Sequence, residues 1–298
     1  PPRLRPPHRG KKGTVMLTRL IIEDAVKRAL LEDAPWGDTT SQHLIPADSV
    51  ATAKLVAREP GVMAGGDVFA AAFQLLEDSV NVAVEVAEGD SFVAGQVIAT
   101  VTGPARAVLT GERVGLNFVQ RMAGIATHTA QYVAAIAGTG AKIVDTRKTT
   151  PGLRPFEKHA VACGGGHNHR YSLSDAVMAK DNHLAILTRG GKDLATELRR
   201  VRAELGHTTH LEVEVDRLDQ IEAVLTGGVD TIMLDNFSID DLRAGVAQVA
   251  GRAVIEASGG VNLSTVRAIA ETGVDVISVG ALTHQIHSLD LGLDIEID

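Results

Sequence analysis

The stretch from Leu211 to Phe237, LEVEVDRLDQIEAVLTGGVDTIMLDNF, decides the fold class of this chain. It begins with a short apolar strand, continues through a helical segment and ends with a second apolar strand that leads into Asp235. Strand and helix alternate in this way when parallel strands are joined by helical crossovers. The stretch therefore predicts one βα unit of an α/β domain.

The same alternation continues through the second half of the chain. We expect a strand followed by a helical segment at residues 142–145, 176–180, 211–215, 231–234, 254–257 and 276–279. Neither a Rossmann dinucleotide fingerprint nor a Walker phosphate loop accompanies these strands. The pattern therefore favours an α/β barrel over a doubly wound sheet.

The region before the barrel has a different pattern. Apolar residues from Ile22 to Leu30 recur at helical spacing, and Pro35 and Gly37 end that helix. Short alternating strands between residues 50 and 105 are separated by Gly-Asp and Gly-Gln turns, which predicts an antiparallel sheet. Residues 87–100 are similar to the hairpins of biotinyl and lipoyl carrier domains. No lysine stands at a hairpin tip there, so a structural sheet is favoured over a carrier domain.

The composition narrows the functional classes. Aromatic residues make up 3% of the chain, too few for the stacking platforms of single-stranded nucleic-acid binders, and we expect no nucleic-acid partner. The formal net charge is −8, so any anion site must be a local cluster of cations. No apolar run is long enough to span a bilayer, and we expect no membrane partner. Cys163 is the only cysteine, which indicates a reducing compartment, the cytoplasm.

Residues 1–15 hold five basic side chains and no acidic one. Such a segment cannot bury enough apolar surface to order itself, and we expect a disordered basic tail. Two alternatives stay open: the segment is sequence translated upstream of the folded protein, or it is part of a transit peptide. Met16, which is followed by a helix-like pattern, is consistent with the first.

Reactive residues follow the carboxyl ends of the expected strands, where barrel enzymes build their active sites. They stand at Asp145–Lys148, Lys180–His183, Glu212–Asp216, Asp235–Asn236, Ser258–Gly260 and Gly280–Ala281. Helix caps and solvated loop charges explain a residue such as Asp216 but not the whole set. The sequence therefore predicts a catalytic site at this edge.

Carboxylates are expected to point into the barrel. The strand period of two places Glu212, Glu214 and Asp216 on one face, and a buried carboxylate needs a cation beside it. Salt bridges to Lys142, Arg147 or Lys180 are one solution. Binding of Mg²⁺ by Glu214 and Asp235 is the other.

An anionic ligand is indicated by two features. Arg147-Lys148 and the run from His167 to Arg170 concentrate cations in an acidic chain. Glycines at Gly259-Gly260 and Gly280 stand between strand and helix, where backbone N–H groups bind phosphate, although tight turns also favour glycine. A zinc site of Cys163, His167, His169 and His183 is disfavoured, because the spacing matches no standard zinc pattern.

These segments resemble the quinolinate phosphoribosyltransferase family. The resemblance rests on seven motifs in the family's order: Asp145–Gly152, Gly164–Arg170, Lys180–His183, Glu212–Asp216, Leu234–Phe237, Glu256–Gly260 and Val279–His284. It covers the chain from about residue 20 to residue 294. One departure is Ser172, where the family more often has glycine, and it bears on the conformation of that loop.

The resemblance implies a fold and an activity. The expected fold is α/β, with an N-terminal α/β sandwich domain (16–121, joined by residues 288–298) and an open, TIM-like barrel of fewer than eight strands (122–287). The implied reaction joins quinolinate to phosphoribosyl pyrophosphate with loss of carbon dioxide and needs Mg²⁺. The implied assembly is a homodimer or higher homo-oligomer.

The resemblance also assigns roles to residues of this sequence. Arg147, His169, Arg170 and Lys180 would hold the two substrate carboxylates, together with Arg113 donated by the neighbouring subunit. Lys148 would contact diphosphate, and Glu214 and Asp235 would meet the ribose hydroxyls and Mg²⁺; these three and Lys180 are the expected catalytic residues. The 5′-phosphate pocket would consist of Ser258, Gly259, Gly260, Gly280 and His284.

Three other functions compete with this one. Nicotinate phosphoribosyltransferase shares the general fold but binds one carboxylate, and the number of cations favours a dicarboxylate. The paralogue associated with molybdenum transport is disfavoured by the intact segments 145–148 and 180–183. A silent sensor of pyridine metabolites is disfavoured because both metal carboxylates and the full cation set are kept.

Overall fold

The computed structural model describes residues 17–297, so the predicted tail at 1–15 lies outside the described residues. The chain divides into two compact units. The first contains the residues up to Ala130, Thr150–Gly165 and the residues from Ile286 on; the second contains Gln131–Thr149 and Gly166–Gln285. Among the described residues, no helix combines the length and apolar character that crossing a membrane requires.

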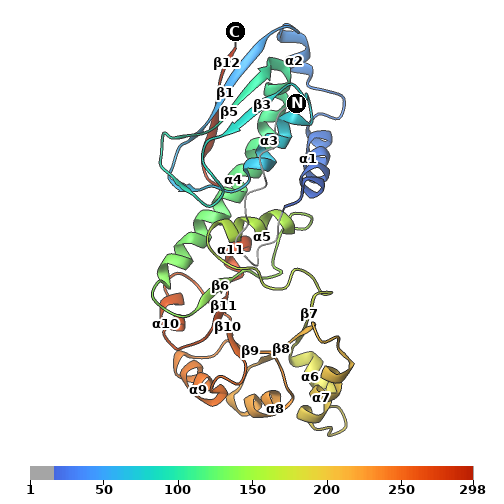
Figure 1. The fold of residues 1–298 in the computed structure, drawn as a ribbon, viewed down its shortest axis with the longest axis vertical. Helices are drawn as coiled ribbons and strands as arrows, with labels where there is room; N and C mark the ends of the chain where they lie inside the picture. Colours follow the sequence, from blue (N-terminus) through green and yellow to red (C-terminus); the bar gives the residue numbers. More distant parts are fainter. Residues whose placement is uncertain (1–16, 298) are drawn as a thin grey trace. The chain divides into compact units, whose positions relative to one another are not determined.

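The first unit is built around an antiparallel sheet with the strand order β12-β1-β5-β3 (Figure 1). Its strands are β1 (Val50–Ala57), β3 (Asn81–Val84), β5 (Val97–Pro104) and β12 (Leu291–Ile297), and a small second sheet pairs β2 (Gly61–Val62) with β4 (Ser91–Phe92). The prediction of an antiparallel sheet is thus confirmed. Alternate residues of β1 are buried, so the period of two places one face of the sheet on the core.

Helices complete this unit: α1 (Arg19–Asp33), α2 (Thr39–Leu44), α3 (Gly66–Gln74), α4 (Ala105–Ala135) and α5 (Arg154–Cys163). The predicted first helix is confirmed as α1, which begins after Thr18, whose hydroxyl accepts a hydrogen bond from the Ile21 N–H. The helix α4 continues from the first unit into the second, so the expected boundary at residue 121 falls inside it.

Glycine allows α4 to lie close to α3. Phe69 and Phe73 of α3 are fully buried, with ring centroids 5.0 Å apart in an edge-to-face arrangement. A Cβ at Gly111 of α4 would come within 2.8 Å of the Phe73 ring. The close packing of these two helices therefore depends on the missing side chain at that position.

The second unit contains a parallel sheet with the order β6-β11-β10-β9-β8-β7. Its strands are β6 (Lys142–Val144), β7 (Ala176–Ala179), β8 (His210–Val215), β9 (Thr231–Asp235), β10 (Val254–Ser258) and β11 (Val276–Ser278). All six strands stand where the sequence predicts them. In the described part of the chain β6 and β7 are the two edges, so the barrel is open, as expected.

Helices follow the strands of the second unit, and Figure 1 shows α8, α9 and α10 on the outer side of the curved sheet. They are α6 (Asp181–Leu187), α7 (Leu194–Glu204), α8 (Ile221–Thr226), α9 (Ile239–Val249), α10 (Val266–Ala270) and α11 (Ala281–His284), with a short 3₁₀ helix at Leu218–Gln220. Leu211, Val213 and Val215 of β8 are buried. Alternation along β8 leaves Glu212 and Glu214 for the interior of the barrel.

Candidate active site

A cavity of about 760 Å³ lies at the carboxyl ends of the parallel strands. Every barrel residue that the sequence analysis assigns to a site lines it: Arg147, Lys148, His169, Arg170, Lys180, Glu214, Asp235, Ser258, Gly259, Gly260, Gly280 and His284. These residues come from segments more than 130 positions apart. They meet because parallel strands bring their carboxyl ends to one edge of the sheet.

Buried Asp145 organises the loop that carries His169. The Asp145 carboxylate accepts hydrogen bonds from the Asn168 side chain (2.7 Å) and from the backbone N–H of His169 (2.9 Å). The side chain of Asp145 is fully buried, so its charge requires these donors. The carboxylate at the end of β6 is therefore structural, and it aims His169 into the barrel.

His169 lies between two buried glutamates. Its Nε2 is 3.1 Å from Glu212 Oε2 and 3.5 Å from Glu256 Oε2. Burial by itself would lower the pKa of His169, but hydrogen bonds to the two carboxylates and their charges raise that pKa to about 10. Burial also raises the pKa of Glu212. The cluster therefore retains a proton well above neutral pH.

The position of that proton follows from the neighbouring groups. The backbone N–H of Arg170 donates to His169 Nδ1 over 2.8 Å, so the raised pKa concerns the proton on Nε2, which faces the Oε2 atoms of both glutamates. The Oε1 atoms of Glu212 and Glu256 are buried without a hydrogen-bond partner among the described residues. Two bare charges so placed would be costly, which favours a further proton shared within the cluster.

Arg170 and Arg147 form the cationic side of the cavity. The Arg170 guanidinium donates to the carbonyl oxygen of Ala176 over 3.0 Å, which holds it against the first residue of β7. Burial lowers the pKa of Arg170, and the positive charge of Arg147 lowers it further. Two neighbouring positive charges favour an anion between or beside them, and planar guanidinium groups suit carboxylates.

Lys180 and Glu214 form an ion pair across β7 and β8, with 2.6 Å between Lys180 Nζ and Glu214 Oε2. Of the partners that the sequence suggested for Glu214, the structure shows the salt bridge to Lys180. On the next strand, Asp235 accepts a hydrogen bond from the Asn236 side chain over 2.7 Å. Both carboxylates line the cavity, and hard oxygen atoms so placed remain suitable ligands for Mg²⁺.

The two glycine turns have different neighbours. Gly259 has φ +90°, and a Cβ there would come 2.1 Å from Asn236 Oδ1 and 2.9 Å from the Asn236 backbone nitrogen. Gly260 has φ +62° with open space around it. A Cβ at Gly280 would come 2.9 Å from Cδ of Lys148. At Gly259 and Gly280 a side chain would collide with a neighbouring residue. Glycine is therefore required there for steric reasons, besides the N–H group that it offers.

Two residues singled out in the sequence lie elsewhere or differ from expectation. Arg113 is exposed on the part of α4 that belongs to the first unit and does not line the cavity. Ser172 does not adopt a positive φ. Its backbone N–H donates to Asp175 over 2.7 Å, and its hydroxyl also donates to that carboxylate. A serine thus fits this loop without backbone strain.

Sequence reasoning assigned no role to Glu256 or Asn236, and it left the partner of Glu212 open. Glu256 lies in the middle of β10 with relative exposure of 3%, directly between two apolar residues of the sequence. A charged residue inside a buried strand is the signal that would have identified it. The disfavoured zinc set does not form a cluster, since His169 contacts glutamates and His183 Nδ1 accepts from the Lys180 N–H.

Comparisons with known proteins agree on one family. Residues 38–123 match the profile of the quinolinate phosphoribosyl transferase N-terminal domain, and residues 125–294 match that of the C-terminal domain. The nicotinate-nucleotide pyrophosphorylase (carboxylating) of Mycobacterium leprae is 44% identical over 281 residues, covering 91% of this chain and 96% of that protein. The probable enzyme of the same name from Bacillus subtilis is 39% identical, covering 94% of this chain and 96% of that protein.

A solved structure extends the similarity to the fold. The crystal structure of NadC from Streptococcus pyogenes superposes with a TM-score of 0.90 at 38% identity, covering 95% of this chain and 98% of that one. The similarity therefore spans both units and not the barrel alone.

Proposed function

The chain belongs to the quinolinate phosphoribosyltransferase family, and we propose that the barrel cavity is the place where it performs the family's reaction. The chain transfers phosphoribosyl from 5-phosphoribosyl 1-pyrophosphate to quinolinate and decarboxylates the product. Nicotinate mononucleotide, pyrophosphate and carbon dioxide result, a step of NAD biosynthesis. The single observation that supports the proposed location is the opposition of cations and carboxylates in one cavity, with Arg147, Arg170 and Lys180 beside Glu214 and Asp235.

The cations are proposed to orient quinolinate. Its two carboxylates match the guanidinium groups of Arg147 and Arg170 and the ammonium group of Lys180, and the proton-rich cluster around His169 adds a further donor. Lys180 already contacts Glu214 in this structure, so we propose that quinolinate shares or replaces that ion pair. Binding of this kind fixes the ring nitrogen toward the ribose and lowers the entropic part of the barrier.

The carboxylates are proposed to act during ribosyl transfer. The ring nitrogen attacks the anomeric carbon as the bond to pyrophosphate breaks, and positive charge develops on the ribose. Glu214 and Asp235, on adjacent strands at the cavity, would stabilise that charge. Mg²⁺, when bound to these carboxylates, would offset the charge of the departing pyrophosphate. The donor set fits this ion, since both carboxylates line the cavity and are oriented by hydrogen bonds from Lys180 and Asn236.

The phosphate groups are proposed to lie along the glycine turns. Backbone N–H groups at Gly259, Gly260 and Gly280 would bind the 5′-phosphate, with Ser258 and His284 beside them. Lys148 would contact the pyrophosphate, and its side chain passes next to Gly280. The Thr283 hydroxyl donates to the Lys148 carbonyl oxygen over 2.7 Å, which supports a fixed position for this lysine.

Decarboxylation needs no covalent nucleophile. Once the ring nitrogen carries ribose it is positively charged, and the bond to the neighbouring carboxylate can break with its electron pair held at the ring carbon. A proton then replaces carbon dioxide at that carbon. Among the described residues, the cavity lining contains cations and proton donors and no cysteine, which suits this chemistry.

A homodimer, or a higher homo-oligomer, with Arg113 acting on the partner's site is part of the proposal. Arg113 is exposed on α4 and is absent from the cavity lining, which leaves it available to another subunit. A cytoplasmic location is also proposed, and the single cysteine supports a reducing compartment.

The test supplies purified protein with phosphoribosyl pyrophosphate and Mg²⁺, and with quinolinate or nicotinate in separate reactions. We expect mononucleotide and carbon dioxide in equal amounts from quinolinate and little product from nicotinate, which leaves part of the cation set unpaired. Efficient use of nicotinate would identify a nicotinate enzyme instead. Binding of quinolinate without turnover would identify a sensor.

A further inference from the structure

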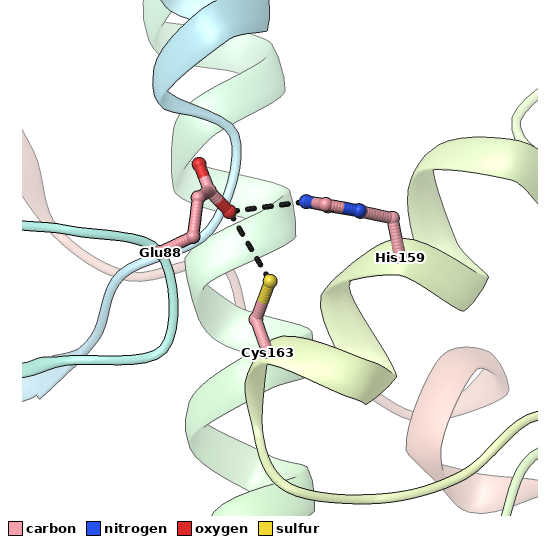
Figure 2. A group of neighbouring side chains, drawn as sticks. All are labelled: Glu88, His159 and Cys163. Carbon is pink, nitrogen blue, oxygen red and sulfur yellow. Dashed lines mark hydrogen bonds and ion pairs between the residues drawn. The ribbon is translucent and has the colours of Figure 1, made fainter. Parts of the chain in front are cut away.

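A carboxylate, an imidazole and a thiol lie close together in the first unit, and none of the three residues lines the cavity. Figure 2 shows Glu88, from the turn between β3 and β4, facing His159 and Cys163 of α5. His159 and Cys163 are four residues apart, so they lie on the same face of the helix one turn from each other. Their ligand atoms and those of Glu88 all lie within 4.8 Å of one another.

Glu88 is held in a fixed orientation by both of its oxygens. Oε1 accepts hydrogen bonds from the backbone N–H groups of Gly65 (2.9 Å) and Gly66 (2.7 Å). Oε2 accepts from His159 Nε2 and from Cys163 Sγ, each over 3.1 Å. Burial would raise the pKa of Glu88, but the hydrogen bonds and charge of His159, the Gly66 N–H and the Cys163 thiol bring it below its ordinary value. The carboxylate is thus ionised and already positioned.

The spacing of the three ligand atoms fits a small tetrahedral cation. Zinc bonds of about 2.0 Å to oxygen and nitrogen and about 2.3 Å to sulfur give a tetrahedron with edges of roughly 3.3 to 3.6 Å. The two edges from Glu88 Oε2 measure 3.1 Å in the structure, and all three ligand atoms lie within 4.8 Å of one another. Rotation about the side-chain torsions that moves the His159 and Cys163 atoms away from Glu88 and toward each other would therefore admit the ion.

We propose that Glu88, His159 and Cys163 bind Zn²⁺ or a similar divalent transition metal, which clamps α5 to the turn between β3 and β4. One thiolate and one carboxylate neutralise the ion, and imidazole completes three protein ligands of types that zinc accepts. The side chains of His159 and Glu88 are 20% and 25% exposed, so a water molecule can reach the fourth position.

The proton balance of binding is defined by the same contacts. The Cys163 thiol, which donates to Glu88, loses its proton to solvent. His159 must bind the ion through Nε2 without a proton on that atom and keep a proton on Nδ1, a nitrogen that has no hydrogen-bond partner in the described part of the chain. Binding therefore releases at least one proton, and affinity should rise with pH.

The test uses Co²⁺ as the probe on the full-length, tag-free protein, with excess Mg²⁺ to fill sites made of oxygen ligands. Because Cys163 is the only cysteine, a thiolate-to-cobalt charge-transfer band reports this site and no other. We expect the band to saturate at one equivalent of Co²⁺, to decrease on addition of Zn²⁺, and to be absent in Cys163→Ser. The cavity cluster of His169 and the glutamates contains no sulfur and cannot produce it.

Two substitutions keep the local hydrogen bonds while weakening the metal site. Glu88→Gln retains the oxygen that accepts from Gly65 and Gly66, and His159→Asn retains a donor toward Glu88. Each should reduce Co²⁺ affinity by at least the roughly 10- to 100-fold that loss of a supporting group costs a metal site. His43→Asn, on the exposed helix α2, is the matched control and should bind as the parent does.

Unfolding provides a second measurement that does not depend on the band. Zn²⁺ should raise the melting temperature of the parent protein and of His43→Asn, but not that of Cys163→Ser. A parent protein that shows no charge-transfer band at saturating Co²⁺ would overturn the proposal and leave the three residues as a purely polar contact. Equal melting shifts in the parent and in Cys163→Ser would overturn it as well.

Discussion

The glycine at 259 offers a sharp test of how the cavity is built. Replacing it with alanine places a methyl group in a backbone conformation with φ +90° and 2.1 Å from Asn236 Oδ1. The positive φ costs about 1–2 kcal/mol of folding free energy for a residue with a Cβ. The Asn236 side chain must also leave, and its 2.7 Å hydrogen bond to Asp235 is lost with it.

The expected loss of activity in Gly259→Ala depends on the hydrogen bond between Asn236 and Asp235. A hydrogen bond to a charged group contributes about 1.5–3 kcal/mol. If Asp235 loses its orientation, kcat/KM for phosphoribosyl pyrophosphate should fall by about 10- to 100-fold, since about 1.4 kcal/mol corresponds to tenfold. The backbone N–H of residue 259 is retained in the variant, so loss of that donor does not contribute.

The chain contains matched controls for the strain. Gly138→Ala, at φ +81°, and Gly251→Ala, at φ +74°, place a Cβ in a comparable backbone conformation with nothing within 4 Å of it, and neither residue lines the cavity. Both variants should lose about 1–2 kcal/mol in denaturant unfolding and keep kcat/KM near the parent value. The reasoning is refuted if Gly259→Ala is as active as these two variants.

Four further predictions concern the other groups of the site. The pKa of about 10 for His169 exceeds the ordinary value of 6.5, so this group stabilises the fold at pH below about 6.5 and ceases to do so as pH rises toward 10. NMR titration of ring-labelled protein should show one histidine that does not titrate near pH 6.5, with its signal missing in His169→Gln. Asp235→Asn should lower turnover much more than stability, and excess chelator should abolish the activity of the parent. Arg147→Ala should weaken quinolinate binding by about 1.5–3 kcal/mol, measured by calorimetry. Mixing inactive Arg113→Ala with inactive Lys180→Ala subunits should restore part of the activity, because some dimers then contain one complete site.

Each of these predictions has an outcome that contradicts it. A set of histidines that all titrate near pH 6.5 would show that the two glutamates do not hold the His169 proton. An Asp235→Asn protein that is unfolded under mild conditions would indicate a structural role, and full activity in chelator would remove the metal. Unchanged quinolinate affinity in Arg147→Ala would remove that residue from the carboxylate site. No recovered activity after proven subunit exchange would place Arg113 outside the partner's site.

Local periodicity was enough to predict the parallel strands and the edge at which reactive residues gather. Alternation along β8 placed Glu212 and Glu214 on one face, and covalent geometry alone produces that alternation. In a parallel sheet every strand directs its carboxyl end to the same edge. The positions of the strands in the sequence were therefore enough to predict that Asp235 and Gly259 line one cavity.

The partners of individual side chains were decided only by tertiary structure. The contact of His169 with Glu256 depends on the loop that Asp145 orients and on the order of the strands across the sheet. The contact of Glu88 with His159 joins residues 71 positions apart. Local propensity acts over a few residues, whereas the free energy that selects these pairs comes from burying charges together and becomes available only when distant segments are packed.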